Sequence, residues 1–258
     1  MRITALLENT TSRNDLQTEH GLSLYIETEK HHILFDMGQT GLFAENARVL
    51  NIDLSTVDIA VLSHGHYDHG GGLKRFLELN SKAPVYVNRH AFEPHYNGCE
   101  KYIGLDTSLA GSDRLISVDN EFKIDDTLSL YSCNGRERRH DMGSFGLNQM
   151  QNGSLIPDDF RHEQYLLIEE AGKRILLSGC SHKGILDIVS WFEPDYLLGG
   201  FHYSKLEAGE VLADAAKLLD SYKTEYYTCH CTGRLQFTFM NEHMRNLHYL
   251  SCGQSLQV

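Results

Sequence analysis

The sequence is poor in several features that would define its class. Only 4 of its 258 residues are proline, and no Pro- or Ser-rich stretch marks a domain boundary. Lys and Arg total 23 against 35 Asp and Glu, and this net charge of −12 argues against a nucleic-acid-binding surface. The apolar runs are far shorter than the roughly 20 residues that a membrane span needs. We therefore expect a single domain, residues 1–258, that binds neither nucleic acid nor membrane.

The N-terminal stretch has no apolar run with a small-residue cleavage site, so a signal peptide is not indicated and we expect a cytoplasmic protein. The six cysteines include no C-x-x-C pair and are too sparse for a disulfide scaffold. Free thiols are expected. The oligomeric state is left open.

The hydrophobic pattern predicts strands that alternate with helices. Helices are expected over 40–51, 71–80, 185–192, 209–222 and 234–244. Strands are expected over 2–9, 57–63, 83–88, 127–134, 164–170, 173–179, 195–201, 225–231 and 247–256, with a hairpin over 22–36. The less regular segment 91–162 is interpreted as a lid or insertion loop, and its polar part 135–154 as a long loop. The order of elements suggests two similar halves, each with helices outside its strands.

Histidine is abundant, with 15 residues, and three of them lie in VLSHGHYDHGGGL at positions 61–73. His64 and His66, two residues apart in a tight turn, can point at one cation, and Asp68 and His69 can hold a second. Imidazole suits Zn, Fe, Mn or Cu, and carboxylate suits Mn or Fe. Glycines 70–72 are expected to allow positive φ and a close approach of the backbone.

Other polar side chains also follow apolar strands. Cys180 and His182 follow KRILLSG, His202 follows DYLLGG, and His230 ends EYYTC. Because functional sites gather at strand carboxyl ends in layered α/β proteins, we expect these groups and the histidine turn to meet.

SHGHYDHGGGL resembles the H-x-H-x-D-H signature of the metallo-β-lactamase superfamily. ILFDMGQTG, SGCSHKGI, GGFH and CHCTG resemble a subgroup that includes dihydropterin-ribofuranosylaminobenzene phosphate synthase and many metal-dependent hydrolases. The resemblance implies an α+β fold, a four-layer αββα sandwich of two mixed sheets with outer helices. It also implies a binuclear metal site.

Carried over to this sequence, the resemblance assigns His64 and His66 to one metal ion and Asp68 and His69 to the other. His230 matches the superfamily's last histidine, a ligand of the second metal. Asp36, after the strand ILFD, matches an aspartate that orients the histidine turn from behind the ligands.

The pattern departs at two positions. Cys180 stands where most members have a bridging aspartate, and it is either a thiolate ligand or a small buried apolar residue. Most members also have a histidine before the strand that precedes the Cys180 strand. In this chain its role is assigned to His182, which we favour, or to His162 in RHEQY. A mononuclear or asymmetric site stays open.

The one dense basic run, GRERRH, contains Arg136, Arg138 and Arg139. It is either a solvated face or a lid that clamps a substrate phosphate or carboxylate through forked guanidinium contacts. His202 is assigned to substrate binding or proton transfer, with packing as the alternative.

The favoured function is a hydrolase in which two divalent metal ions activate a water molecule that attacks a small anionic ester, phosphate or similar substrate. Zinc is the expected metal, and manganese or iron are the alternatives. Asp68 would ligate and take a proton, and His202 would protonate the leaving group. One alternative is a transferase similar to the pterin synthase. Another is an iron redox or sensor protein, because Cys229 and Cys231 flank His230.

Overall fold

The structure is a computed structural model that describes residues 1–258, and it divides into two compact units. The first unit comprises Met1–Asp119, Gly146–Gln164 and Ser251–Val258, and the second comprises Asn120–Phe145 and Tyr165–Leu250. Since each unit combines segments that are distant in the sequence, no linker separates them in the chain.

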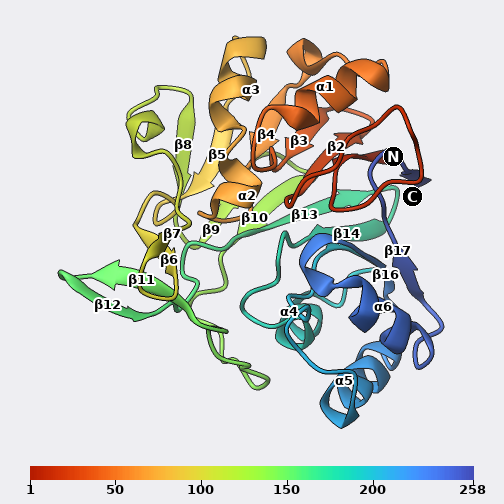
Figure 1. The fold of residues 1–258 in the computed structure, drawn as a ribbon. Coiled ribbons are helices and arrows are strands. Elements are labelled where there is room, and N and C mark those ends of the chain that lie inside the picture. The colour runs from red at the N-terminus through yellow and green to blue at the C-terminus, as the bar shows by residue number, and fades with distance from the viewer. The chain divides into compact units, whose positions relative to one another are not determined.

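A seven-stranded mixed sheet forms the base of the first unit (Figure 1). In spatial order its strands are β18 (Ser255–Gln257), β1 (Arg2–Leu7), β2 (Ser23–Glu27), β3 (His32–Phe35), β4 (Ile59–Val61), β5 (Val85–Asn88) and β8 (Leu115–Val118). Pairs from β18 to β3 are antiparallel, and pairs from β3 to β8 are parallel. The termini therefore lie side by side in Figure 1.

Helices α1 (Leu42–Val49) and α3 (Leu73–Leu79) cover one face of this sheet, and the short α2 (Tyr67–Gly70) precedes α3. Helix α1 turns Phe43, Ala44 and Ala47 into the core, the i, i+1, i+4 spacing of one helix face. Phe76 of α3 joins the same buried cluster. Two 3₁₀ turns, η1 (Leu54–Thr56) and η2 (Thr107–Leu109), complete this part.

The second unit repeats the plan with another seven-stranded sheet. Its strands are, in spatial order, β17 (Leu247–Tyr249), β16 (Glu225–Thr228), β15 (Tyr196–Gly199), β14 (Lys173–Leu177), β13 (Tyr165–Glu170), β10 (Leu128–Tyr131) and β9 (Glu121–Lys123). The four strands from β17 to β14 are parallel, and the others are antiparallel.

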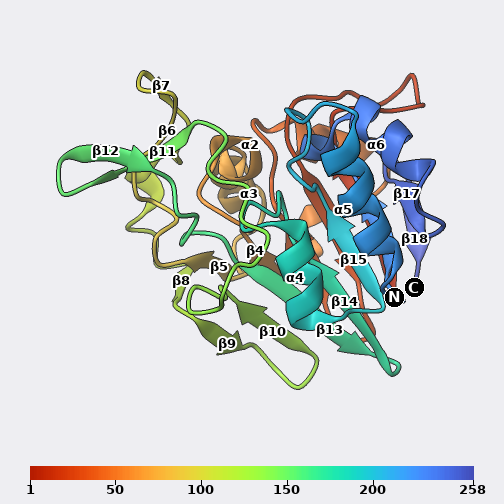
Figure 2. The ribbon, with the colours of Figure 1, turned by 90° about the horizontal axis from the view of Figure 1, so that it is seen from below.

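Helices α4 (Ile185–Phe192), α5 (Glu210–Asp220) and α6 (Arg234–Asn241) pack on this second sheet, and Figure 2 shows α4 and α5 running along it. The 3₁₀ turn η3 (His230–Thr232) follows β16. The apolar faces of the helices meet buried strand residues in one core cluster. The predicted alternation of strands and helices is confirmed in both units.

A third sheet lies in the first unit, and it corrects the prediction of a long loop over 135–154. Its order is β12 (Ser154–Pro157), β11 (Leu147–Gln151), β6 (His95–Asn97) and β7 (Lys101–Tyr102). Strands β11 and β12 form a hairpin, because Asn152 and Gly153 adopt the positive φ that a tight turn requires. Residues 132–146 contain no helix or strand.

The expected strand over 247–256 is also wrong as one element. It is two strands, β17 in the second unit and β18 in the first, separated by a turn at Gly253 with φ of 86°. The longest helix, α5, has 11 residues, and no helix has both the length and the apolar character to cross a membrane.

All six cysteines are free thiols, as predicted, and only Cys99 is exposed. Burial, reinforced by the charge of Glu8, raises the pKa of the Cys252 thiol to about 12. Since thiolate is the reactive form, Cys252 resists thiol reagents at every pH well below 12.

We predict that an aromatic disulfide reagent at pH 8 modifies Cys99 rapidly in the native protein and Cys252 only after unfolding. The measurement is the time course of thiol release, with mass mapping of the modified peptide. A fast phase that persists in Cys99→Ser would contradict this assignment.

Candidate metal centre

The histidine turn begins where β4 ends and is packed too tightly for side chains larger than hydrogen at its glycines. A Cβ at Gly65 would lie 2.2 Å from the carbonyl oxygen of Ala91, and one at Gly72 would lie 2.2 Å from that of Met37. Gly71 and Gly72 have φ of −62° and −79°. The predicted close approach is therefore present, but positive φ at these glycines was a wrong expectation.

A carboxylate, Asp36, anchors this turn from the end of β3. Its Oδ1 accepts the backbone N–H of Ser63 at 2.7 Å, and its Oδ2 accepts the Ser63 hydroxyl at 2.7 Å. The same Oδ2 accepts Nδ1–H of His69 at 2.6 Å. Asp36 is fully buried and has φ of 60°, a left-handed conformation that aspartate tolerates better than most residues.

The network assigns the tautomers of two histidines. Because the Ser63 hydroxyl donates to Asp36, its oxygen accepts from Nδ1–H of His64, 2.8 Å away. His64 and His69 thus both carry the proton on Nδ1, which leaves Nε2 as the nitrogen with a lone pair. A carboxylate that fixes the tautomer in this way is typical of metal-binding histidines.

Asp68, at the start of α2, lies beside the turn with its carboxylate only slightly exposed. Its Oδ2 is 4.0 Å from Nε2 of His69 and 3.2 Å from Nε2 of His20. The His20 side chain is 55% exposed, so the pair connects a buried carboxylate to solvent. His20 has no motif in the sequence that would have singled it out.

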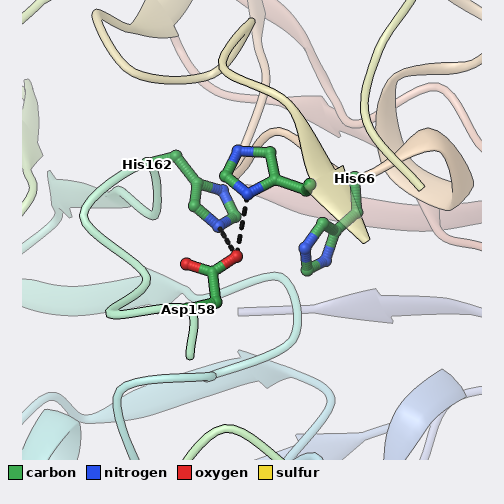
Figure 3. A group of neighbouring side chains, drawn as sticks. His66, Asp158 and His162 are labelled. Carbon is green, nitrogen blue, oxygen red and sulfur yellow. Dashed lines mark hydrogen bonds and ion pairs between the residues drawn. The ribbon is translucent and has the colours of Figure 1, made fainter. Parts of the chain in front are cut away.

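A second group of donors includes His66, and Figure 3 shows His66 beside Asp158 and His162. His66, His95, Asp158 and His162 are all buried and each offers a ligand atom within 4.8 Å of the others. Asp158 directly follows β12, and His95 opens β6. Asp158 Oδ2 is 2.8 Å from Nδ1 of His95 and 3.4 Å from Nε2 of His162.

The loop 158–164 is held firmly against the histidine turn. The N–H of Gly65 donates to Nδ1 of His162 at 2.9 Å. The backbone N–H of Gln164 donates to the carbonyl of Ser63, and its side-chain amide to that of Leu62, both at 2.8 Å. With Nδ1 of His162 accepting a hydrogen bond, the proton of its neutral ring sits on Nε2, which faces Asp158.

Burial and neighbouring imidazoles shift two pKa values in this group. Burial acts to raise the pKa of Asp158, but His162 and His95 outweigh it, and the pKa lies well below its usual range. Burial, with His162 and His95, holds the pKa of His66 well below its ordinary value. His66 is therefore neutral at pH 7, the form in which imidazole binds metal ions.

The second unit carries its own donor cluster at the carboxyl ends of β14, β15 and β16. Cys180, His182 and His202 offer ligand atoms within 4.8 Å of one another, and so do Cys180, His230 and Cys231. The His182 and His202 ring centroids are 4.3 Å apart. Since β14, β15 and β16 are parallel neighbours, their carboxyl ends share one edge, which brings these residues together.

Cys231 is a further member of this cluster, which was considered from the sequence only for the redox or sensor alternative. The Sγ atom of Cys231 is 3.6 Å from the carbonyl oxygen of Cys180. It also packs against Gly200, because a Cβ at position 200 would lie only 2.3 Å from this sulfur atom. Burial acts to raise the pKa of Cys231, but hydrogen bonds with Cys180 and His202 and the His230 charge lower it well below the ordinary value.

The basic run is fixed to the start of α4 in the second unit. Asp187 accepts the backbone N–H groups of Arg139 and His140, both at 3.0 Å. Arg136 donates to the carbonyl of Trp191 at 3.0 Å, and Arg139 donates to Glu137 at 3.1 Å. A cavity of about 370 Å³ is lined by Arg136, Glu137, Arg139, Asp187, Ser190 and Trp191.

Comparison with known proteins identifies the family. The model of the metallo-β-lactamase superfamily matches residues 17–223. The chain belongs to the metallo-β-lactamase superfamily. A crystal structure of a metal-dependent hydrolase of the β-lactamase superfamily is similar, with 29% sequence identity and a TM-score of 0.84. The similarity covers 100% of this chain and 99% of the hydrolase chain. The predicted α+β fold class is therefore confirmed.

Two proteins of Methanocaldococcus jannaschii are similar over nearly the whole chain. One is an uncharacterised protein, 30% identical over 98% of this chain and 99% of its own. The other is 7,8-dihydropterin-6-methyl-4-(β-D-ribofuranosyl)-aminobenzene-5′-phosphate synthase, 28% identical over 93% of this chain and 90% of its own. The metallo-β-lactamase fold protein YhfI of Bacillus subtilis, 10% identical with a TM-score of 0.62 over 99% of this chain and 98% of its own, shares the fold.

The predicted ligands of this superfamily member divide between the units. His64, His66, Asp68 and His69 lie in the first unit, and Cys180, His182 and His230 lie in the second. His162, ranked below His182 from the sequence, lies in the first unit beside His66. His95 and Asp158 were missed, because no motif or spacing links positions 66, 95 and 158.

We predict that Asp36→Asn weakens zinc binding about 10- to 100-fold, the usual effect of removing a group that orients a ligand. An amide presents an N–H where Ser63 and His69 both need an acceptor, while asparagine still tolerates the left-handed backbone. Chelator competition measures the affinity. Asp53→Asn, an exposed cap of η1, is the matched control. Wild-type zinc affinity in Asp36→Asn would contradict the orienting role.

Proposed function

We propose that the protein is a metal-dependent hydrolase of a small anionic substrate. The observation that carries the proposal is the Asp36–Ser63 network, which fixes the tautomers of His64 and His69 so that both Nε2 atoms present lone pairs. Histidines that only face solvent would not need a buried carboxylate to fix their tautomers. Family membership and the hydrolase assigned to a solved relative at 29% identity support the same conclusion.

The donor sets fit divalent transition metals. Imidazole and carboxylate in the first unit suit zinc, manganese or iron, and the Cys180 thiol in the second favours zinc among these. His64, His66, Asp68 and His69 would hold metal in the first unit, and Cys180, His182 and His230 in the second. A bound divalent metal lowers the pKa of coordinated water to about 7 and polarises the substrate.

Asp68 and His202 handle protons in this proposal. Asp68 Oδ2 takes a proton and passes it to Nε2 of His20, 3.2 Å away and half exposed to solvent. His202 gives a proton to the leaving group. Its ring lies in the donor cluster of the second unit, with Cys180 and His182.

Arg136, Arg138 and Arg139 supply positive charge for the anionic substrate. The Asp187 contacts hold the backbone of this run in place, and guanidinium groups pair well with phosphate or carboxylate. The neighbouring cavity of about 370 Å³ is large enough for a small molecule.

The test is metal analysis of protein purified without chelators, followed by assays on ester and phosphate substrates with added Zn or Mn.

We predict that Asp68→Asn lowers kcat by about 100-fold or more, because it removes the proton acceptor. Asp106→Asn, an exposed cap, is the control. Wild type that retains no metal and gains no activity with Zn or Mn would rule the proposal out. An iron-dependent visible band would instead support the redox alternative.

A second candidate is transfer rather than hydrolysis, and the 28%-identical pterin-related synthase favours it. In that case the arginine run would hold a ribose phosphate. Incubation with a dihydropterin pyrophosphate, with and without an aminobenzene ribotide acceptor, separates the two reactions. Acceptor-dependent product indicates transfer, and phosphate release without acceptor indicates hydrolysis.

A further inference from the structure

We propose that His95 and Asp158, which lie outside the H-x-H-x-D-H motif, take part in binding a divalent metal ion beside His66, with Nε2 of His95 as a ligand and Asp158 as the carboxylate that orients His95. The inference deepens the proposed function and rests on it, since it requires a metal ion beside His66. It concerns only residues of the first unit.

The group has the arrangement of a carboxylate, an imidazole and a metal ion in series. Asp158 Oδ2 accepts Nδ1–H of His95 at 2.8 Å and faces Nε2 of His162 at 3.4 Å. The proton on Nδ1 leaves the lone pair of His95 on Nε2, the nitrogen that can bind a cation. His66 belongs to the same buried group, in which each residue offers a ligand atom within 4.8 Å of the others.

The charge of the group calls for a cation. The Asp158 side chain is fully buried, and its ion-pair partners are the imidazoles of His95 and His162 rather than lysine or arginine. Its other oxygen accepts the N–H of Phe160 at 2.8 Å. A buried carboxylate is costly unless it is paired, and a divalent ion on Nε2 of His95 adds positive charge to the ring that pairs with Asp158.

His95 gives the second, independent observation. Its Nε2 is buried and has no hydrogen-bond partner, while its Nδ1 faces Asp158. A purely structural His–Asp pair would leave this buried nitrogen without a partner, which is unfavourable. An unpaired buried polar atom of this kind commonly marks the position of an ion or water.

A hydrogen-bonded structural triad without metal is the competing interpretation, and zinc binding separates the two. The full chain is stripped of metal, titrated with Zn²⁺ alone against a chromophoric chelator, and analysed for zinc per chain. We predict that His95→Gln and Asp158→Asn each weaken one zinc equivalent by at least about 10- to 100-fold. His90→Gln is the matched control, because His90 pairs with Glu93 at 2.7 Å in the same segment but is not among the four donors.

The wild-type protein gives a test that does not depend on variant folding. On saturation with Zn²⁺, the ring ¹⁵N signals of His95 should move to metal-bound values. Unchanged His95 signals, or wild-type zinc affinity in folded His95→Gln and Asp158→Asn, overturn the proposal.

The result is distinguishable from failure of the proposed function. If hydrolysis is found while His95→Gln binds zinc normally, the function stands and this site fails. If zinc binds and His95→Gln weakens it but no ester or phosphate is hydrolysed, the site stands and the hydrolase assignment fails.

Discussion

The buried carboxylate of Asp36 is the interaction on which the metal centre depends. A single side chain at the end of β3 determines the backbone of Ser63 and the proton positions of His64 and His69. Because all these groups are buried, solvent cannot replace Asp36 if it is lost, and its left-handed backbone is maintained by the hydrogen bonds it accepts. The sheet of the first unit therefore serves to place one carboxylate beneath one turn.

The two units present different chemistry to a metal ion. In the first unit the donors are imidazoles and carboxylates, whereas the second adds the thiols of Cys180 and Cys231 to its histidines. Softer sulfur ligands favour zinc over magnesium or calcium, and oxygen ligands widen the choice to manganese and iron. A protein with both donor types can hold unlike metals or hold one metal with unequal affinities.

Much of the fold was predictable, because strand and helix periodicity depends on local sequence. The hairpin over 22–36 was found from its turn-like middle, and the helix containing Phe43 from its apolar spacing. The hairpin of β11 and β12 was missed because LNQMQ is polar, and its strand character comes from pairing with β6. His95 and Asp158 were missed for a related reason, since they meet only through that tertiary pairing. Asp36 was recognisable through the resemblance of ILFDMGQTG to the superfamily, whose members have an aspartate after this strand.

Gly65 shows how little freedom the histidine turn has. With the Ala91 carbonyl only 2.2 Å from the place of a Cβ, even alanine would push two backbone segments apart. A saturation library at position 65 should therefore yield almost exclusively glycine among active clones. Laboratory evolution of new substrate preference would have to proceed through the surrounding loops, leaving the turn itself as an invariant platform.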